Sequence, residues 1–150
     1  MLLLIFLLLQ LPLSAQQEKT NASPEAADEP SASKLIVVIP FENLSKAPGL
    51  EWIGEAFAEL ITNNISSPSL YTIGREDRSY AFDRLGIPLD AHLSRATLYR
   101  IAEQMDVDYV IFGAFNYDGS NFTAKARLLD MKKLHLSPEK IGRASCRERV

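Results

Sequence analysis

The first clear pattern in the chain is a run of apolar residues over positions 35–39, Leu-Ile-Val-Val-Ile, which stops at Pro40. A strand with one face in water alternates apolar and polar residues, and this run does not alternate. The pattern therefore predicts a strand that is buried on both faces, as in the middle of a parallel sheet. Glu42 and Asn43 end the strand, and a helical pattern follows soon afterwards.

Residues 50–66 have the spacing of an amphipathic helix. Pro48-Gly49 precedes this segment and Ser66-Ser67-Pro68 closes it, and both are typical boundary signals. A short apolar segment over residues 70–73 predicts a second strand, so the three elements form a right-handed βαβ unit. The predicted buried stripe of the helix recurs at steps of three and four residues, at Ile53, Ala56, Phe57, Leu60, Ile61 and Ile65.

Two further helices are predicted in the middle of the chain. Residues 75–85 form a short helix that Gly86 closes, with Pro88 just beyond. Ser94 is placed to cap the next helix. Its apolar positions are Leu98, Ile101, Ala102 and Met105.

A strand pair ends the folded region. Residues 107–115 predict a buried strand, Asp118-Gly119 is a hairpin turn signal, and residues 122–130 alternate apolar and polar. The alternation predicts a half-exposed antiparallel strand at a sheet edge. The fold class is therefore an α/β domain of two or three layers with a small mixed sheet of three or four strands, in the order β-α-β-α-α-β-β, whose last strand is antiparallel.

Both ends of the chain differ from this domain. Residues 1–15 read as a signal peptide, apolar up to Leu13 with a small residue, Ala15, at the cleavage site. Residues 16–33 are rich in Ala, Ser, Pro and Glu and predict a flexible linker. We therefore expect an exported chain whose domain spans residues 34–139, with no transmembrane helix after cleavage.

Residues 140–150 resemble the translation of a common sequencing-library adapter, so we expect the natural protein to continue past Glu139 in a different way. Residues 141–150 hold three of the 16 basic residues, one of the 19 acidic residues and the only cysteine, Cys146. The remainder has 13 basic and 18 acidic residues, a net charge of −5. An acidic domain is a poor binder of nucleic acid, and a domain without cysteine suits an oxidising compartment.

The chain resembles the TolB-like amino-terminal domain family. The matching segments are 39–45 (Ile-Pro-Phe-Glu-Asn-Leu-Ser), 52–57 (Trp-Ile-Gly-Glu-Ala-Phe), 101–110 (Ile-Ala-Glu-Gln-Met-Asp-Val-Asp-Tyr-Val), Gly113 and the strand 122–130. The resemblance implies a non-catalytic α/β module of the bacterial periplasm, with protein partners in envelope assemblies. It also implies fusion to a second unit, for which tetratricopeptide repeats are our leading expectation.

The residues themselves offer little catalytic or metal chemistry. His92 and His135 are far apart and outside any ligand motif, so they are expected at the surface or as helix-capping residues, and no metal or cofactor is predicted. Asp106 and Asp108 flank the start of a buried strand and are interpreted as solvated acids. The cluster Arg75-Glu76-Asp77-Arg78 and the pair Lys132-Lys133 are interpreted as solvated charged surface. No catalytic residue is predicted, and the chain is not expected to be an enzyme.

The loop after the first strand is the one candidate binding site. Open α/β sheets bind ligands beyond the carboxyl ends of their strands. The candidate residues in this loop are Glu42, Asn43, Ser45 and Lys46. Two functions remain open: a non-catalytic, exported interaction or assembly module, and a sensor domain that binds a small ligand in this loop.

Overall fold

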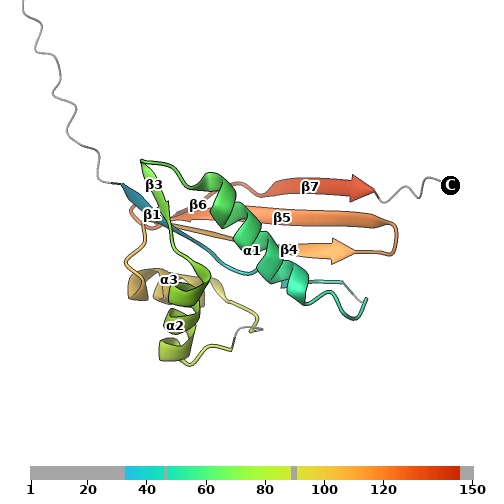
Figure 1. Cartoon of the computed structure of the whole chain (residues 1–150), viewed down its shortest axis with the longest axis horizontal. Coiled ribbons are helices and arrows are strands. Elements are labelled where there is room, and N and C mark those ends of the chain that lie inside the picture. The colour runs from blue at the N-terminus through green and yellow to red at the C-terminus, as the bar shows by residue number, and fades with distance from the viewer. Residues whose placement is uncertain (1–32, 46, 89–90, 146–150) are drawn as a thin grey trace, which may run out of the picture. The chain divides into compact units, whose positions relative to one another are not determined.

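The computed structural model describes residues 33–45, 47–88 and 91–145 (Figure 1). The elements in chain order are β1 (Lys34–Val38), β2 (Glu42–Asn43), α1 (Trp52–Ile65), β3 (Leu70–Thr72), α2 (Arg75–Leu85), α3 (Arg95–Gln104), β4 (Tyr109–Tyr117), β5 (Asn121–Asp130), β6 (His135–Leu136) and β7 (Lys140–Ser145).

The strands form one mixed sheet in the order β3-β1-β4-β5-β6, with β2 beside β4 and β7 beside β5. β1 is parallel to β3 on one side and to β4 on the other. β4 and β5 are antiparallel over nine residue pairs, from Tyr109↔Asp130 to Tyr117↔Phe122. The predicted α/β fold, the central position of the first strand and the antiparallel closing hairpin are confirmed.

Strand β2 was not predicted, because Glu42 and Asn43 were interpreted as loop. Val38 pairs with Ile111 and Glu42 pairs with Ala114. The chain therefore advances four residues from Val38 to Glu42, while β4 advances three residues from Ile111 to Ala114. Pro40 lies in this interruption, and a proline cannot donate to a sheet ladder. The chain bulges at the proline and then resumes pairing with β4.

The prediction that residues 122–130 form an edge strand is wrong. β5 pairs with β4 on one side and with β6 and β7 on the other. Both β6 and β7 are missing from the predicted order, and the sheet has seven strands where three or four were expected. Whether residues 140–150 derive from an adapter is a separate question of origin, and that interpretation stays a prediction.

Helices cover the two faces of the sheet. On one face, α1 packs against Val38 and Phe115; on the other, α2 and α3 pack against Val37, Val110 and Leu129. Val37 and Val38 are neighbours in β1 and point to opposite faces, as the period of a strand requires. The non-alternating run of the first strand is thereby explained, and the domain has three layers.

The buried stripe of α1 differs from the prediction. Ala56 is exposed and Leu60 is 60% exposed, whereas Gly54 and Ala58 are buried against the sheet. The main-chain N–H of Phe41 donates to the carbonyl of Gly54 over 3.1 Å. This close approach rotates α1 so that its smallest residues face the sheet.

The caps of the other helices are confirmed. Gly86 has φ of 64° at the end of α2, and its N–H donates to the carbonyl of Asp83. The hydroxyl of Ser94 accepts from the N–H of Thr97 over 3.1 Å. No helix in the described part of the chain is both long and apolar enough to span a membrane.

Candidate functional site

A cavity of about 420 Å³ lies beyond the carboxyl end of β1. Its floor is apolar and is formed by side chains of the core, while polar groups from four segments surround it. The floor includes Ile39, Phe82, Leu98 and Phe112. The polar lining residues are Glu42, Asn43, Glu51, Glu55, Arg75 and His92.

The topology places the cavity at this end of the sheet. The chain leaves β1 toward α1 on one face and leaves β3 toward α2 on the other face. Two adjacent parallel strands whose connections go to opposite faces leave a crevice between those connections. The loop after β1, the start of α1 and the start of α2 all line the cavity for this reason.

The candidate residues lie partly in this cavity. Glu42 and Asn43 line it, whereas Ser45 does not, and Lys46 lies outside the described residues. The side-chain carbonyl of Asn43 accepts hydrogen bonds from the N–H and the hydroxyl of Ser45. Asn43 and Ser45 therefore build the turn after β2, and the oxygen of Asn43 is committed to it.

Glu42 meets a residue that is distant in the sequence. Nδ1 of His92 lies 2.5 Å from Oε1 of Glu42, and His92 is mostly exposed, as expected. Both residues line the cavity, so the contact joins the loop after β1 to residue 92 at one side of it. His135 is also exposed, on β6.

Glu55 joins α1 to α2 at the other side of the cavity. Its carboxylate forms ion pairs with Arg78 and with Arg75, where Nε of Arg75 lies 3.5 Å from Oε1. The side chain of Arg78 is 2% exposed, and Arg75 is 60% exposed. Burial lowers the pKa of Arg78, and the charge of Glu55 opposes this effect.

The interpretation of Arg78 as part of a solvated surface is wrong. Its guanidinium lies under α1 and donates from Nη1 to the carbonyl of Val38 over 3.0 Å. The sequence carried a signal for this position, because Arg78 falls in step with the buried side of α2 at Ala81, Phe82 and Leu85. A charged residue in an apolar stripe indicates a buried ion pair.

Glu51 differs from the other acidic residues of the cavity in the contacts of its carboxylate. It is exposed at the start of α1, and its carboxylate forms no ion pair or hydrogen bond within the described residues. Glu42 and Glu55 already have basic partners. The lining therefore suits a ligand with an apolar body and a polar or cationic group that reaches Glu51.

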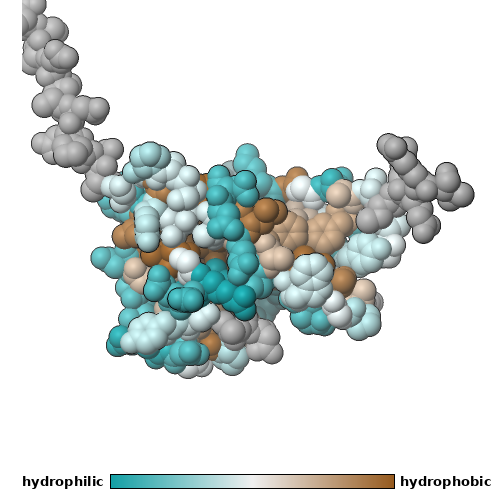
Figure 2. Space-filling model, viewed as in Figure 1, coloured by the Kyte–Doolittle hydropathy of each residue, from teal (hydrophilic) through white to brown (hydrophobic). Residues whose placement is uncertain are grey.

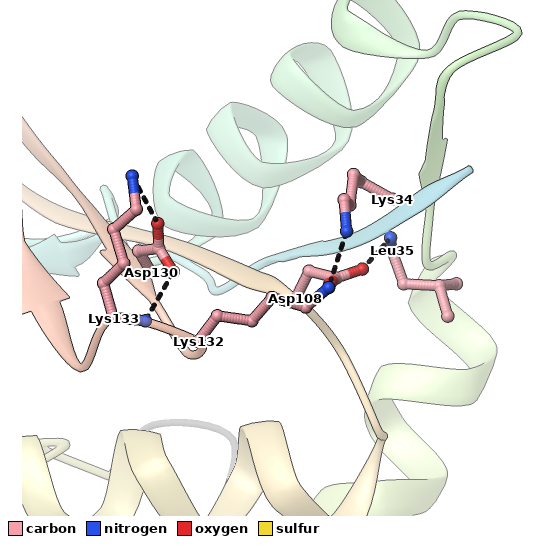
Figure 3. A network of polar contacts seen from close by, with 6 residues as sticks. All are labelled: Lys34, Leu35, Asp108, Asp130, Lys132 and Lys133. Carbon is pink, nitrogen blue, oxygen red and sulfur yellow. Dashed lines mark hydrogen bonds and ion pairs between the residues drawn. The ribbon is translucent and has the colours of Figure 1, made fainter. Parts of the chain in front are cut away.

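Asp108 is not the solvated acid that was expected, although Asp106 is exposed. Its carboxylate accepts from the N–H of Leu35 over 3.0 Å and pairs with Lys34 at 3.3 Å and Lys132 at 3.4 Å (Figure 3). The hydrogen bond from Leu35, followed by the two ammonium groups, lowers the pKa of Asp108. Asp108 thus ties the start of β4 to the start of β1.

The pair Lys132-Lys133 belongs to the same network, as exposed partners of two aspartates. Lys133 lies 4.0 Å from the carboxylate of Asp130, and its main-chain N–H donates to the same side chain over 3.0 Å (Figure 3). The network is structural, since its acids are neutralised by local bases. In the described ranges, no group of three or more His, Cys, Asp and Glu side chains is placed to hold a metal ion.

No known family model and no curated protein sequence matches the chain. Among solved structures, the LpoB C-terminal domain from Salmonella enterica has 16% sequence identity and a TM-score of 0.60, over 79% of this chain and 87% of that one. Lipoprotein GNA1162 from Neisseria meningitidis has 17% identity and a TM-score of 0.56, over 75% and 80%. The molecule is therefore an α/β domain with an LpoB-like fold.

TolB from Acinetobacter baumannii aligns with 14% identity and a TM-score of 0.44, over 73% of this chain and 22% of that chain. This likeness is too low to support an argument. Membership of the TolB-like family, which the motifs suggested, stays a prediction, as do the domain boundaries at residues 15, 33 and 139.

Proposed function

We propose that the chain is a non-catalytic interaction or assembly module that is exported to the bacterial periplasm. In this proposal it forms the amino-terminal part of a larger protein that continues into tetratricopeptide repeats. The signal-peptide pattern of residues 1–15 and the fold shared with the LpoB domain and a lipoprotein support it.

The observation that carries the proposal is the outer surface of α1. Trp52 is 67% exposed and Leu60 is 60% exposed, and the exposed Ala56 lies between them at four-residue steps along the same side of the helix. Tryptophan is enriched among the residues that dominate the energy of protein interfaces. This side of α1 is therefore the surface that we assign to the protein partner.

The test compares partner capture by the parent chain with capture by a variant that carries Trp52→Glu and Leu60→Glu. Both residues are exposed, so the variant should keep its thermal unfolding midpoint while it loses the envelope proteins that the parent cross-links. Tyr80→Glu is the matched control, because Tyr80 is 64% exposed on α2. Identical sets of cross-linked proteins for the parent and the double variant would contradict the proposal.

A second candidate function, a small-ligand sensor, is favoured by the cavity beyond β1. Thermal-shift screening with nucleotides, sugars and short peptides tests it, since a ligand that binds only the folded state raises the unfolding midpoint. Stabilisation that Glu51→Gln removes would support the sensor. Asn43 is unsuitable for this test, because its replacement also breaks the turn with Ser45.

A further inference from the structure

The turn of the β4–β5 hairpin contains the only Asp-Gly sequence of the chain, at Asp118-Gly119. This turn lies at the end of the hairpin that is distant from α2 and α3 (Figure 1), and its residues 118–121 are all exposed. An aspartate before a glycine can isomerise, because glycine has no Cβ to hinder attack by its main-chain nitrogen on the neighbouring carboxyl group. The turn therefore holds the bond of the chain that is most prone to this reaction.

Isomerisation of this aspartate proceeds through a cyclic imide. The main-chain nitrogen of Gly119 forms a bond to Cγ of Asp118 and loses its proton, and a carboxyl oxygen leaves as water. Water then attacks the main-chain carbonyl carbon of Asp118 and breaks its bond to the nitrogen of Gly119. The main chain now runs through Cβ and Cγ, which makes the residue an isoaspartate. The water that is released in the first step is consumed in the second, so the reaction needs no other reactant.

The conformation of the turn requires the glycine. The φ of Gly119 is 100°, and glycine adopts this conformation without the steric cost that a Cβ adds. The hydroxyl of Tyr117 also donates to the carbonyl of Gly119 over 2.7 Å, which ties this residue to the end of β4. The turn thus selects, at position 119, the residue that leaves Asp118 least hindered. The durability of the bond therefore depends on how the carboxylate of Asp118 is held.

The carboxylate of Asp118 is held by the two residues that follow the glycine. Its Oδ1 accepts from the N–H of Asn121 over 2.7 Å and from the N–H and hydroxyl of Ser120 over 3.0 and 3.1 Å. The side-chain amide of Asn121 donates to Oδ2 over 3.2 Å. Hydrogen bonds to a charged acceptor are stronger than those to a neutral one. Ring closure discharges the carboxylate and expels one of its oxygens, so it forfeits these bonds.

The same hydrogen bonds keep the reactive form of the side chain rare. They lower the pKa of Asp118 to about 2, and the N–H of Asn121 makes the largest contribution. The neutral carboxyl group is the form that readily loses water. At pH 5, a carboxyl group with this pKa is neutral roughly 50 to 100 times less often than one with the ordinary aspartate pKa. The closed turn therefore opposes the reaction that its own sequence favours.

We propose that Asp118 is a modification site that the hairpin controls: it is protected while the turn is closed and isomerises to isoaspartate when the turn opens. Isomerisation lengthens the main chain by one atom and removes the side-chain carboxylate that binds Ser120 and Asn121. The closed turn, with Tyr117 paired to Phe122, cannot re-form in the same way. A hairpin that isomerises while it is open is therefore altered permanently.

The alteration reaches the contact between the hairpin and α1. Phe122 on β5 stacks on Phe57 of α1, with the ring centroids 5.6 Å apart. The space-filling view shows an apolar surface beside α1, over β5 and β7 (Figure 2). A hairpin with a lengthened turn would shift Phe122 and so disturb this apolar margin of α1.

The experiment incubates the full chain at mildly acidic pH, folded in buffer and unfolded in urea. Liquid chromatography with mass spectrometry then measures the isoaspartate content of the peptide that contains Asp118. The ratio of the unfolded rate to the folded rate defines the protection, and this ratio cancels the intrinsic reactivity of each sequence. We expect a protection of about ten-fold or more for the parent, because its hydrogen bonds favour the charged form of the side chain. Equal rates in the two states would overturn the proposal.

Two variants test whether the contacts of the carboxylate provide the protection. Ser120→Pro removes both the N–H and the hydroxyl that reach Oδ1, whereas the matched control Ser120→Ala removes the hydroxyl alone. Asn121→Ala removes the amide donor to Oδ2 and keeps the main-chain N–H. We expect protection to fall several-fold in Ser120→Pro, to fall less in Asn121→Ala and to stay near that of the parent in Ser120→Ala.

The unfolding midpoint of each variant shows whether its hairpin is intact. A loss of protection in Asn121→Ala, or in a Ser120→Pro variant that keeps the midpoint of the parent, supports the proposal. Protection equal to that of the parent in both variants, or in the only one that folds, overturns it, because the contacts of the carboxylate would then have no effect on the reaction.

Discussion

Arg78 on α2 donates a hydrogen bond from Nη1 to the main-chain carbonyl of Val38 on β1 over 3.0 Å, although the two residues are 40 positions apart. The same guanidinium pairs with Glu55 on α1. One buried side chain thus connects helices from opposite layers through the end of the central strand. Of these three residues, Glu55 also lines the cavity beyond β1.

Replacement of Arg78 by Ala should destabilise the domain by about 3 kcal/mol or more, because removal of one partner leaves buried polar groups unpaired. Urea unfolding measures this loss. Arg75→Ala is the matched control: Arg75 also pairs with Glu55 but is 60% exposed, so it should cost at most about 1 kcal/mol. Equal costs for the two variants would show that Arg78 does not hold the layers together.

Gly54 and Gly113 should tolerate no side chain, because both face Phe41. A Cβ at Gly54 would collide with the carbonyl oxygen of Phe41. A Cβ at Gly113 would collide with the carbonyl oxygen of Lys125 and would lie 2.6 Å from Cε1 of Phe41. Each change to Ala should therefore destabilise the domain by about 3 kcal/mol, at the upper end of overpacking costs.

Chemical unfolding of Gly54→Ala and Gly113→Ala can be compared with that of Gly142→Ala. A Cβ at Gly142 meets nothing within 4 Å, and Gly142 has no positive φ. The control should stay within about 0.5 kcal/mol of the parent, as surface substitutions usually do. A parent-like midpoint for either buried glycine variant would show that α1 or the hairpin can shift at low cost.

Asp108 should give the domain a pH-dependent part of its stability. Its pKa is lowered in the folded state, first by the N–H of Leu35 and then by Lys34 and Lys132. A group with a depressed folded pKa stabilises the fold above its unfolded pKa of about 4 and loses this effect as the pH falls through the folded value. Asp108→Asn should therefore be less stable than the parent at neutral pH, and the difference should shrink toward about pH 3.

Urea unfolding of the two proteins across this pH range checks the sign. Asp106→Asn is the control, since Asp106 is exposed and forms no ion pair within the described residues. A difference between Asp108→Asn and the parent that stays constant as the pH falls would assign the effect to packing.

Asp118 should act in the same direction at lower pH. The N–H groups of Asn121 and Ser120 donate to its carboxylate over 2.7 and 3.0 Å and lower its pKa to about 2. Asp118→Ala should weaken the β4–β5 hairpin at neutral pH, and the advantage of the parent should disappear only as the pH falls from about 4 to about 2.

Hydrogen exchange of the β4 and β5 amides at several pH values measures this local effect. Ser120→Ala serves as the control: it removes the Ser120 hydroxyl but keeps its N–H, so most of the turn should remain. Equal exchange rates in Asp118→Ala and the parent at neutral pH would contradict the assigned role.

The sequence by itself determined the type and order of most elements. The unbroken apolar run at residues 35–39, the glycine at position 86 and the serine at position 94 act through neighbouring residues, because strand period and helix caps are local properties. For this reason the strand and the two helix caps were predicted correctly from the sequence. The same local patterns were sufficient to predict the α/β class and to locate the loop that lines the cavity.

Only the tertiary structure decided which side chains meet. The burial of Arg78 depends on Val38 and Glu55, which come from other elements, and the place of Asp108 depends on Leu35 and Lys132. The rotation of α1, which exposes Leu60, follows from the contact of Gly54 with Phe41. These outcomes depend on packing between distant segments, and the pattern of one segment does not contain the shape of its neighbours.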